Sequence, residues 1–377
     1  MIFWTICVLA VGLVSMILAG ILIPQILRVA FLKRLFDIPN ERKIHRTVVP
    51  RLGGMAFVPV VFFSISLVLG GSIVLGHDAL YREVIGNMKS LSLISCAVIM
   101  LYLVGLVDDL IGVKYRTKFT VQILCALFLV ASGMSLANFQ GLLFIHVLPL
   151  WIGIPFTVLL VVFIINAINL IDGIDGLASG LAGMSLLFYG FIFYVLHEYV
   201  YALVAFAVLG TVIPFFYYNV FGKAERRKKI FMGDTGTLTI GLLLSFLSLK
   251  LCTCEMKQIV LVNPLVMAFV PFMIPCLDVL RVFWCRIRNH KNPFMPDKTH
   301  IHHKLMGIGL NQHMTMISLL LISLTISVVN IFLSLYWDIN FLLLFDLMIW
   351  VIFNRWLTRQ KEKYNEQKMV KNIYIHE

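Results

Sequence analysis

The length, composition and charge of the chain exclude several classes of protein at once. The chain has 377 residues, of which 60% are hydrophobic and only 13% charged, and its mean hydropathy is +0.94. A soluble domain is typically about half apolar and about a quarter charged, so a soluble enzyme, a disordered chain and a disulfide-knit secreted domain are excluded. The net charge of +12 would suggest nucleic acid in a soluble protein, whereas in a membrane protein it reports which side faces the cytoplasm. We therefore expect a membrane protein and no nucleic-acid partner.

Long apolar runs give the predicted elements in chain order. A membrane-spanning helix needs about 20 mostly apolar residues, whereas barrel strands would give short alternating segments. The first run lacks the basic leader of a signal peptide, and we expect it to be a retained helix. The sequence thus predicts an all-α polytopic membrane protein with about eleven transmembrane helices, over 2–27, 53–75, 91–107, 119–136, 148–168, 177–196, 200–218, 236–252, 259–283, 314–336 and 341–357.

The distribution of basic residues predicts which of the two possible orientations these spans have in the membrane. An odd number of spans puts the termini on opposite sides, and 27 of the 31 Lys and Arg residues fall on the side that holds the C-terminus. Because positively charged loops stay in the cytoplasm, we expect the N-terminus outside and the C-terminus in the cytoplasm. We also expect one integral-membrane domain over 1–357 and a basic cytoplasmic tail over 358–377. The 27 basic residues lie in the segments 28–51, 108–118, 219–235, 281–313 and 355–377.

Five carboxylates fall on the cytoplasmic side of this map, at or near the ends of predicted spans. Ionised groups at membrane depth are costly and usually line polar cavities. Acids also favour helix N-termini, but that does not explain an adjacent pair at the C-terminal end of a span, because like charges repel without a cation or basic partner. The sequence therefore predicts a metal and phosphate site at the cytoplasmic face. The five residues are Asp108, Asp109, Asp172, Asp175 and Asp234.

Two of these acidic segments also carry glycines. Segment 166–178 reads NAINLIDGIDGLA, and segment 231–238 reads FMGDTGTL, with an Asp between glycines just before a new span. Glycine lets the backbone approach a ligand closely, and the N–H groups at the start of a helix can receive phosphate. Oxygen ligands of this kind suit Mg²⁺, which commonly bridges carboxylates and substrate phosphates.

A histidine cluster and a basic loop are the remaining candidates. His300, His302 and His303 lie in the longest predicted cytoplasmic loop. A zinc site is one interpretation, but no cysteine lies nearby and the acids prefer a harder ion, so phosphate contacts or acid–base catalysis are favoured. The first loop contains Arg42 and His45. It is either a positive-inside anchor or a basic lip for an anionic substrate, and physical reasoning leaves both open.

These motifs together resemble the polyprenyl-phosphate N-acetylhexosamine-1-phosphate transferase family. The resemblance runs from about residue 37 to 305, and the His-Ile-His-His form is similar to the branch that uses UDP-GlcNAc. The motifs occur in this order: Asp37-x-Pro39 with Arg42-Lys43-x-His45, Pro50-Arg51-x-Gly53-Gly54, Val107-Asp108-Asp109, Asn166-Ala167-x-Asn169-Leu170-x-Asp172-Gly173-x-Asp175-Gly176, Met232-Gly233-Asp234-Thr235-Gly236 and His300-Ile301-His302-His303.

The resemblance implies a reaction. The phosphate of undecaprenyl phosphate attacks the β-phosphorus of UDP-GlcNAc, UMP leaves, and undecaprenyl-diphosphate-GlcNAc remains in the bacterial inner membrane, where it initiates a cell-envelope polysaccharide such as an O-antigen or a teichoic acid. Mg²⁺ is the implied cofactor, with Mn²⁺ as a substitute. The implied partners are undecaprenyl phosphate, a UDP-amino sugar and the lipid bilayer, and a homodimer is left open.

The resemblance also implies roles for individual residues. Asn169 and Asp234 resemble the metal-binding pair, and Asp108 and Asp109 the essential pair near the lipid phosphate. Asp108 would promote deprotonation of the acceptor, although a covalent aspartyl intermediate has also been argued for the family. The further catalytic residues that the resemblance implies are Asp172, Asp175, His302 and His303.

The implied substrate-binding residues come from several loops. Lys118 resembles the basic residue that meets phosphate, Asn219 an amide that precedes the Gly-Asp loop, and Phe231 an aromatic that packs on uracil. Basic sequence over 222–229 separates Asn219 from Asp234 beyond what the family pattern has. The remaining implied substrate-binding residues are Arg42, His45 and His300.

Two alternatives stay open at this point. The first is the same reaction with another UDP-HexNAc or with UDP-MurNAc-pentapeptide, because spacing cannot locate the residues of a sugar pocket. The second is a transporter of a lipid phosphate or nucleotide sugar. A transporter is expected to place polar groups near the midplane and to show an internal repeat, whereas here the acids gather at one face.

Overall fold

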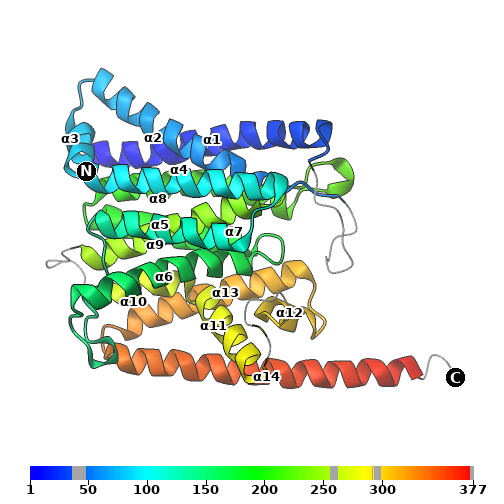
Figure 1. Cartoon of the computed structure of the whole chain (residues 1–377). Helices are drawn as coiled ribbons and strands as arrows, with labels where there is room; N and C mark the ends of the chain where they lie inside the picture. The colour runs from blue at the N-terminus through cyan, green and yellow to red at the C-terminus, as the bar shows by residue number, and fades with distance from the viewer. Residues whose placement is uncertain (36–47, 255–261, 291, 293–298, 374–377) are drawn as a thin grey trace.

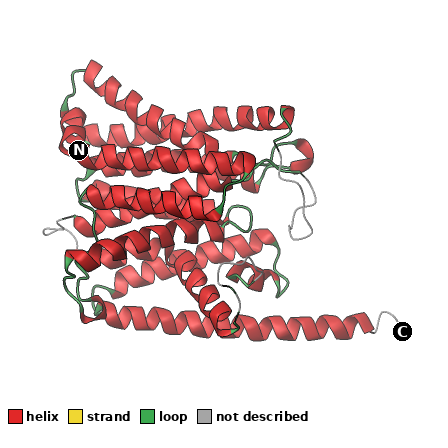
Figure 2. Cartoon of the chain, in the orientation of Figure 1, coloured by secondary structure: helices red, strands yellow, loops and turns green. Residues whose placement is uncertain are grey.

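The chain is helical throughout the part that the structure describes. This computed structural model describes residues 1–35, 48–254, 262–290, 292 and 299–373. Within them every regular element is a helix, and the one β-bridge joins Asn138 to Val147 (Figure 2). In a bilayer the backbone must satisfy its own hydrogen bonds, which helices do within one segment. The predicted all-α polytopic fold is therefore confirmed for these residues.

The helices follow the apolar runs closely. Their bounds in chain order are α1 Ile2–Leu32, η1 Gly53–Ala56, α2 Phe57–Val74, α3 Ala79–Gly86, α4 Met88–Ile111, α5 Tyr115–Ala131, η2 Leu142–Phe144, α6 Leu150–Ile171, α7 Leu177–Val195, α8 Tyr199–Val220, η3 Ala224–Arg226, α9 Gly233–Thr253, α10 Pro264–Phe269, η4 Val270–Phe272, α11 Met273–Arg288, α12 Ile301–Met306, α13 Gln312–Leu333 and α14 Ile339–Ile373.

Ten helical segments of the described chain are long and apolar enough to cross a membrane. The eleventh predicted span, 119–136, corresponds to α5, which has 17 residues, the lower limit of the roughly 17–25 that a spanning helix needs. α5 packs against both α4 and α6, and the three run side by side across the bundle (Figure 1). The N-terminus and the end of α14 lie at opposite ends of the bundle in that view, as an odd number of crossings requires. The count of eleven stays a prediction.

Two predicted segments differ from the observed helices. The run predicted as one span over 259–283 is divided into α10, η4 and α11, with Pro271 inside η4 and Pro275 inside α11. Proline removes a backbone N–H and disrupts regular α-helix, and α11 crosses the neighbouring helices steeply (Figure 1). The predicted boundary between domain and tail at residue 357 lies inside α14, which is continuous to Ile373.

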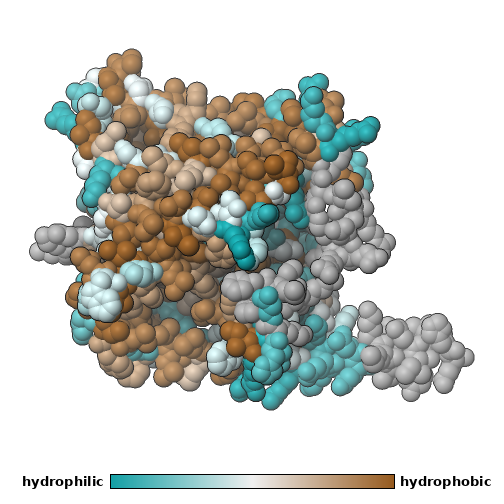
Figure 3. All heavy atoms as spheres, viewed as in Figure 1, coloured by the Kyte–Doolittle hydropathy of each residue, from teal (hydrophilic) through white to brown (hydrophobic). Residues whose placement is uncertain are grey.

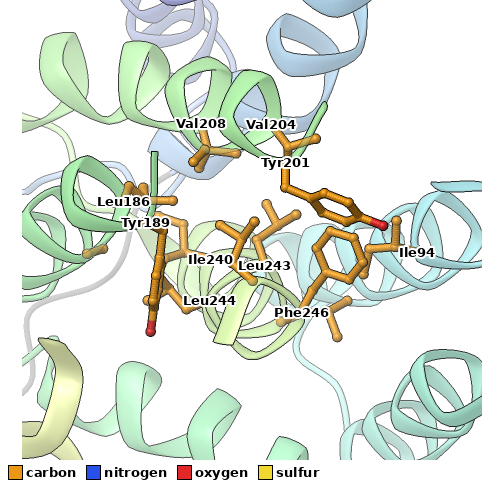
Figure 4. Packing of buried hydrophobic residues seen from close by; sticks show 14 of the residues in the cluster. Ile94, Leu186, Tyr189, Tyr201, Val204, Val208, Ile240, Leu243, Leu244 and Phe246 are labelled. Atoms are coloured by element: carbon orange, nitrogen blue, oxygen red, sulfur yellow. The ribbon is translucent and has the colours of Figure 1, made fainter. Parts of the chain in front are cut away.

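Helix α9 forms the centre of the bundle. Sixteen of its 21 residues are buried, and it packs against α4, α6, α7 and α10. Figure 4 shows its apolar side chains meeting those of α4, α7 and α8. The labelled residues are Ile94 of α4, Leu186 and Tyr189 of α7, Tyr201, Val204 and Val208 of α8, and Ile240, Leu243, Leu244 and Phe246 of α9.

The outer surface of the bundle suits a bilayer. In the face shown by Figure 3, hydrophobic residues cover the middle and most hydrophilic residues gather toward the left and right ends. Many large apolar side chains of α1, α13 and α14 are exposed, as helices surrounded by lipid require. The chain is thus a multi-pass membrane protein.

Candidate active site

Polar residues from four helices meet at one end of the bundle. Asp108 and Asp109 lie in the last turn of α4, and Lys118 lies in the first turn of α5. Asn169 lies near the end of α6, and Asp234 lies in the first turn of α9. The α4–α5 connection is short because Gly112 has a φ of +78°, a left-handed conformation that glycine adopts without strain. The sequence-predicted acids of α4 and α9 are therefore neighbours.

The Lys118 ammonium is shared by two carboxylates. Its Nζ lies 2.7 Å from Asp108 Oδ2 and 2.6 Å from Asp234 Oδ2. Oxygen atoms of Asp108, Asp109 and Asp234 all lie within 4.8 Å of one another. Three acids this close repel unless cations compensate them, and Lys118 supplies one positive charge. The remaining negative charge and the oxygen donors fit a hard divalent cation such as Mg²⁺.

Asp109 holds the start of α9. Its Oδ1 accepts a hydrogen bond from the backbone N–H of Asp234 at 2.8 Å. Its Oδ2 accepts from the N–H of Thr235 at 2.9 Å and from the Thr235 hydroxyl at 2.5 Å. The first N–H groups of a helix have no partner within the helix, and Asp109 satisfies two of them. Asp109 therefore positions Asp234, and both carboxylate oxygens of Asp109 accept hydrogen bonds from the start of α9.

Two amide side chains join α6 to its neighbours at the same end. Asn169 Nδ2 donates to Asp234 Oδ1 at 3.2 Å and to the Thr237 hydroxyl at 2.7 Å. One turn earlier, Asn166 donates to Gln122 of α5 at 2.6 Å. These bonds fix the end of α6 against α5 and α9, so that the amide of Asn169 lies beside the carboxylate with which it was expected to hold a metal.

The turn between α6 and α7 adds two more carboxylates. Asp175 is buried and its Oδ2 lies 2.5 Å from Lys229 Nζ. Asp172 is partly buried at the end of α6. Burial and, to a smaller extent, the negative charge of Asp175 together raise the pKa of Asp172 to about 7. Asp172 therefore keeps its proton to a higher pH than an ordinary Asp.

Asn219 has a structural position that the sequence did not indicate. It is buried at the end of α8, accepts from the backbone N–H of Gly176 at 2.6 Å, and donates to the carbonyl of Ile230 at 2.8 Å. It therefore joins the turn that carries Asp175 to the segment that leads into the Gly-Asp loop. Both the oxygen and the nitrogen of the Asn219 amide thus form hydrogen bonds with the protein backbone.

Phe231 and the first glycine pair lie together beside α9. The N–H of Gly53 donates to the carbonyl of Phe231, and the N–H of Gly54 to that of Met232, both at 2.9 Å. A Cβ at Gly54 would overlap the backbone of Gly236, so that only glycine allows this approach. The segment 50–54 and the Gly-Asp loop are far apart in sequence, but their backbones are joined by hydrogen bonds.

The histidine cluster is anchored by a buried acid. His300 Nδ1 lies 2.8 Å from Asp278 Oδ2, and Arg281 donates to Asp278 Oδ1 at 2.7 Å. The ring of His302 lies against Gly173, where a Cβ would overlap it. Burial and, to a smaller extent, the neighbouring His303 and His300 together lower the pKa of His302 to about 3, so that this ring is neutral at physiological pH. The cluster thus borders the turn that holds Asp172.

Asp278 and Arg281 are residues that the sequence reasoning missed. They lie in α11 at spacing i, i+3, inside a run that was predicted as an apolar span. The available signal was the acid itself, because an ionisable residue within a predicted span is a functional candidate by default.

Three predicted residues remain to be placed, namely His303, Arg42 and His45. His303 packs its ring against that of His302, with centroids 4.3 Å apart. Arg42 and His45 lie outside the described residues, so their predicted role as a basic lip stays a prediction.

Comparison with known proteins identifies relatives of this chain. Residues 91–252 match the model of glycosyl transferase family 4, and this segment contains the acids of α4, of the α6–α7 turn and of α9 but not the histidine cluster. A probable undecaprenyl-phosphate N-acetylglucosaminyl 1-phosphate transferase of Bacillus subtilis (strain 168) is 30% identical over 318 residues, 84% of this chain and 82% of that protein.

Two further relatives are undecaprenyl-phosphate alpha-N-acetylglucosaminyl 1-phosphate transferases. That of Yersinia pestis is 28% identical over 311 residues, 81% of this chain and 78% of its own. That of Salmonella typhi is 29% identical over 287 residues, 75% of this chain and 72% of its own. Because these similarities extend over most of both chains, the chain belongs to glycosyl transferase family 4.

Proposed function

We propose that the chain transfers GlcNAc-1-phosphate from UDP-GlcNAc to undecaprenyl phosphate and so initiates a cell-envelope polysaccharide. The observation that carries this proposal is the group of three carboxylates from α4 and α9, within 4.8 Å of one another, with Lys118 between two of them. Such a group lies at the end of a membrane bundle, where a lipid phosphate and a soluble nucleotide sugar can meet. The names of the relatives supply the choice of donor and acceptor.

The proposed orientation follows from charge. With most basic residues on the side of the site, the positive-inside rule assigns the site to the cytoplasmic face of the bacterial inner membrane. The proposed acceptor is confined to the bilayer and the proposed donor dissolves in the cytoplasm, so that only this face offers both substrates to one site.

In the proposed reaction one bond to the β-phosphorus forms and another breaks. An oxygen of the acceptor phosphate attacks the β-phosphorus of UDP-GlcNAc, and the bond from that phosphorus to the bridging oxygen breaks. The electron pair leaves with UMP, and the sugar phosphate stays on the lipid. In phosphoryl transfer the protein acts mainly by positioning and by stabilising charge, which is a role that cations and oriented dipoles perform.

Several residues of the chain fit that role. Lys118 offers an ammonium beside Asp108, and we propose that it receives acceptor phosphate. The backbone N–H groups at the start of α9 are held by Asp109, which keeps Asp234 in place. Burial lowers the pKa of His302, and the one N–H of a neutral imidazole can donate a hydrogen bond to the diphosphate. Asp175 keeps Lys229 at the site.

We propose Mg²⁺ as the cofactor, with Mn²⁺ as a substitute, held by Asp234 and Asn169 with Asp108 nearby. When bound, the ion would neutralise charge on the diphosphate of the donor. The carboxylate and amide oxygens in this group are the donors that Mg²⁺ prefers. Removal of divalent ions by EDTA should abolish turnover, and added Mg²⁺ should restore it.

The test is an assay of the purified full chain with undecaprenyl phosphate, Mg²⁺ and a panel of UDP-sugars. We expect release of UMP with UDP-GlcNAc and formation of the lipid-linked sugar, detected by mass spectrometry. UMP release only with a different UDP-HexNAc, or only with UDP-MurNAc-pentapeptide, would mean that this compound and not UDP-GlcNAc is the donor. No release with any donor would contradict a transferase and favour a transporter.

A further inference from the structure

A second basic site lies at the same end of the bundle, outside the acidic cluster. A cavity of about 610 Å³ opens between the last turns of α1, the end of α8 and the loop that contains η3. This loop carries Arg226, Arg227 and Lys228, which the proposed reaction does not use. The loop is folded on itself, because the N–H of Lys228 donates to the carbonyl of Lys223 at 3.1 Å.

The cavity is lined by four cations. Arg28 comes from α1, whereas Arg226, Arg227 and Lys228 come from the loop. All four side chains are exposed, and none of them forms an ion pair with another described residue. Among the described residues that line the cavity there is no acid. Cations that are gathered from two separate segments without acidic partners form a site for an anion, whereas a solvated basic face would interleave them with acids.

The walls of the cavity are aromatic and apolar. The guanidinium of Arg227 lies over the ring of Phe31, 5.5 Å from its centroid. Tyr217, Tyr218 and Leu27 also line the cavity. Tyrosines with one apolar and one polar end are enriched at the level of lipid headgroups. This lining suits a ligand with a charged head and an apolar body better than a free anion.

The surroundings of the cavity place it at the edge of the bilayer. Leu32 on α1 is 73% exposed, and Phe221 at the end of α8 is 63% exposed. Both side chains are large and apolar, and they stand beside the cations at the end of two membrane helices. A lipid that enters from the membrane side would therefore meet the cations with its headgroup and the apolar residues with its chains.

The loop separates this cavity from the acidic cluster. Arg227 has a φ of +55°, which reverses the chain direction within the loop. Lys229, two residues later, is not among the residues that line the cavity and pairs with Asp175 instead. The cavity and the proposed active site thus use different residues of one short segment.

We propose that this cavity binds the headgroup of an anionic phospholipid from the cytoplasmic leaflet, such as phosphatidylglycerol. Basic pockets between membrane helices on the cytoplasmic side are suited to anionic headgroups. The site is distinct from that of the proposed acceptor, and it does not depend on the chain being a transferase, because its occupancy is measured without turnover.

The test uses native mass spectrometry of the purified full chain in detergent. Phosphatidylglycerol, phosphatidylcholine, undecaprenyl phosphate and soluble glycerol 3-phosphate are titrated separately. We expect one phosphatidylglycerol to bind more tightly than phosphatidylcholine. Each basic residue near an anionic surface contributes about fivefold in affinity, so Arg226→Gln/Arg227→Gln should weaken binding about thirtyfold. Arg28→Gln, on the other wall, should weaken it about fivefold.

The matched control is Arg355→Gln/Arg359→Gln, which removes two exposed charges from α14 instead. Its affinity for phosphatidylglycerol should equal that of the unmodified chain. Arg226→Lys/Arg227→Lys should retain most of the binding, and unfolding temperatures in detergent without lipid show whether each variant folds. Equal loss in the control, equal affinity for the two phospholipids, tighter binding of undecaprenyl phosphate, or binding of glycerol 3-phosphate as strong as that of lipid would each overturn the proposal.

Discussion

At the scale of single residues, charge compensation explains why the acidic cluster is stable. Asp108 and Asp234 share the Lys118 ammonium, whereas Asp109 binds N–H groups at the start of α9. The adjacent pair that was predicted from sequence thus divides into two roles. Asp108 faces a cation and can face a substrate, whereas Asp109 faces its own protein and positions Asp234.

The first prediction concerns the two acids that share Lys118. We expect Asp234→Ala and Asp108→Asn each to reduce UMP release at least about a hundredfold, since removal of one electrostatic group from an active site typically costs about 10²–10³ in rate. Membrane expression should stay normal. Asp78→Asn is the matched control, because Asp78 is exposed and lies between α2 and α3 without a capping hydrogen bond. Near-normal turnover in Asp234→Ala would contradict the assignment of Asp234 to the active site.

The second prediction concerns the pH dependence of stability. Burial raises the pKa of Asp172 to about 7, whereas an unfolded Asp titrates near about 3.9. Between these two values the folded state holds a proton that the unfolded state has lost, so stability falls as the pH rises from about 4 to about 7 and levels off above that. Asp172→Asn cannot ionise, so its unfolding temperature should exceed that of the unmodified chain by more at pH 8 than at pH 5.5. Thermal unfolding in EDTA measures this, and a gap that does not change with pH would contradict it.

At the scale of helices, glycine contacts decide how closely the bundle packs. Gly105 of α4 faces the first turn of α9, where a Cβ would lie 2.6 Å from the Thr235 Cα. Small residues let membrane helices approach closely. The same device acts at Gly241, where a Cβ would lie 2.8 Å from the Ile165 Cα of α6.

The third prediction tests this packing. Gly105→Ala should lower the free energy of unfolding by roughly 1–3 kcal/mol, the usual cost of overpacking, and should reduce turnover because Thr235 adjoins Asp234. Gly70→Ala in α2 is the matched control, since a Cβ there meets nothing within 4 Å. Its unfolding temperature should be unchanged or higher. Thermal unfolding of both variants in the same detergent decides the matter, and equal effects would exclude the proposed contact.

Most helices could be predicted from the sequence because a bilayer demands long apolar segments. The division into α10, η4 and α11 could not be predicted, because membrane helices tolerate proline where neighbours satisfy the freed backbone groups. The acidic end of the bundle was predictable because charge is rare in this chain. The pairing of Lys118 with two acids, the cap formed by Asp109 and the anchor at Asp278 depend on tertiary contacts, which spacing along the sequence does not contain.

At the scale of the whole molecule, the charge distribution orients the bundle. The net charge of +12 comes mainly from segments that the topology assigns to one side, and the acidic cluster lies at that end. The fourth prediction is that green fluorescent protein fused after Glu377 fluoresces and alkaline phosphatase fused there is inactive. The reverse pattern would contradict a cytoplasmic C-terminus, and with it the proposed cytoplasmic site.

The burial of α9 has a consequence for how the protein is made. Its mean hydropathy is among the lowest of the ten spans, yet it is the most deeply buried of them. The buried hydroxyl groups of Thr239 and Ser245 donate to carbonyls of α9 itself, whereas that of Thr235 donates to Asp109 of α4. Such a segment gains little from contact with lipid alone. During synthesis α9 should therefore leave the translocon late and enter the bilayer together with the helices made before it, α4 to α8. The segment that carries Asp234 would then be the one whose insertion depends most on the rest of the protein.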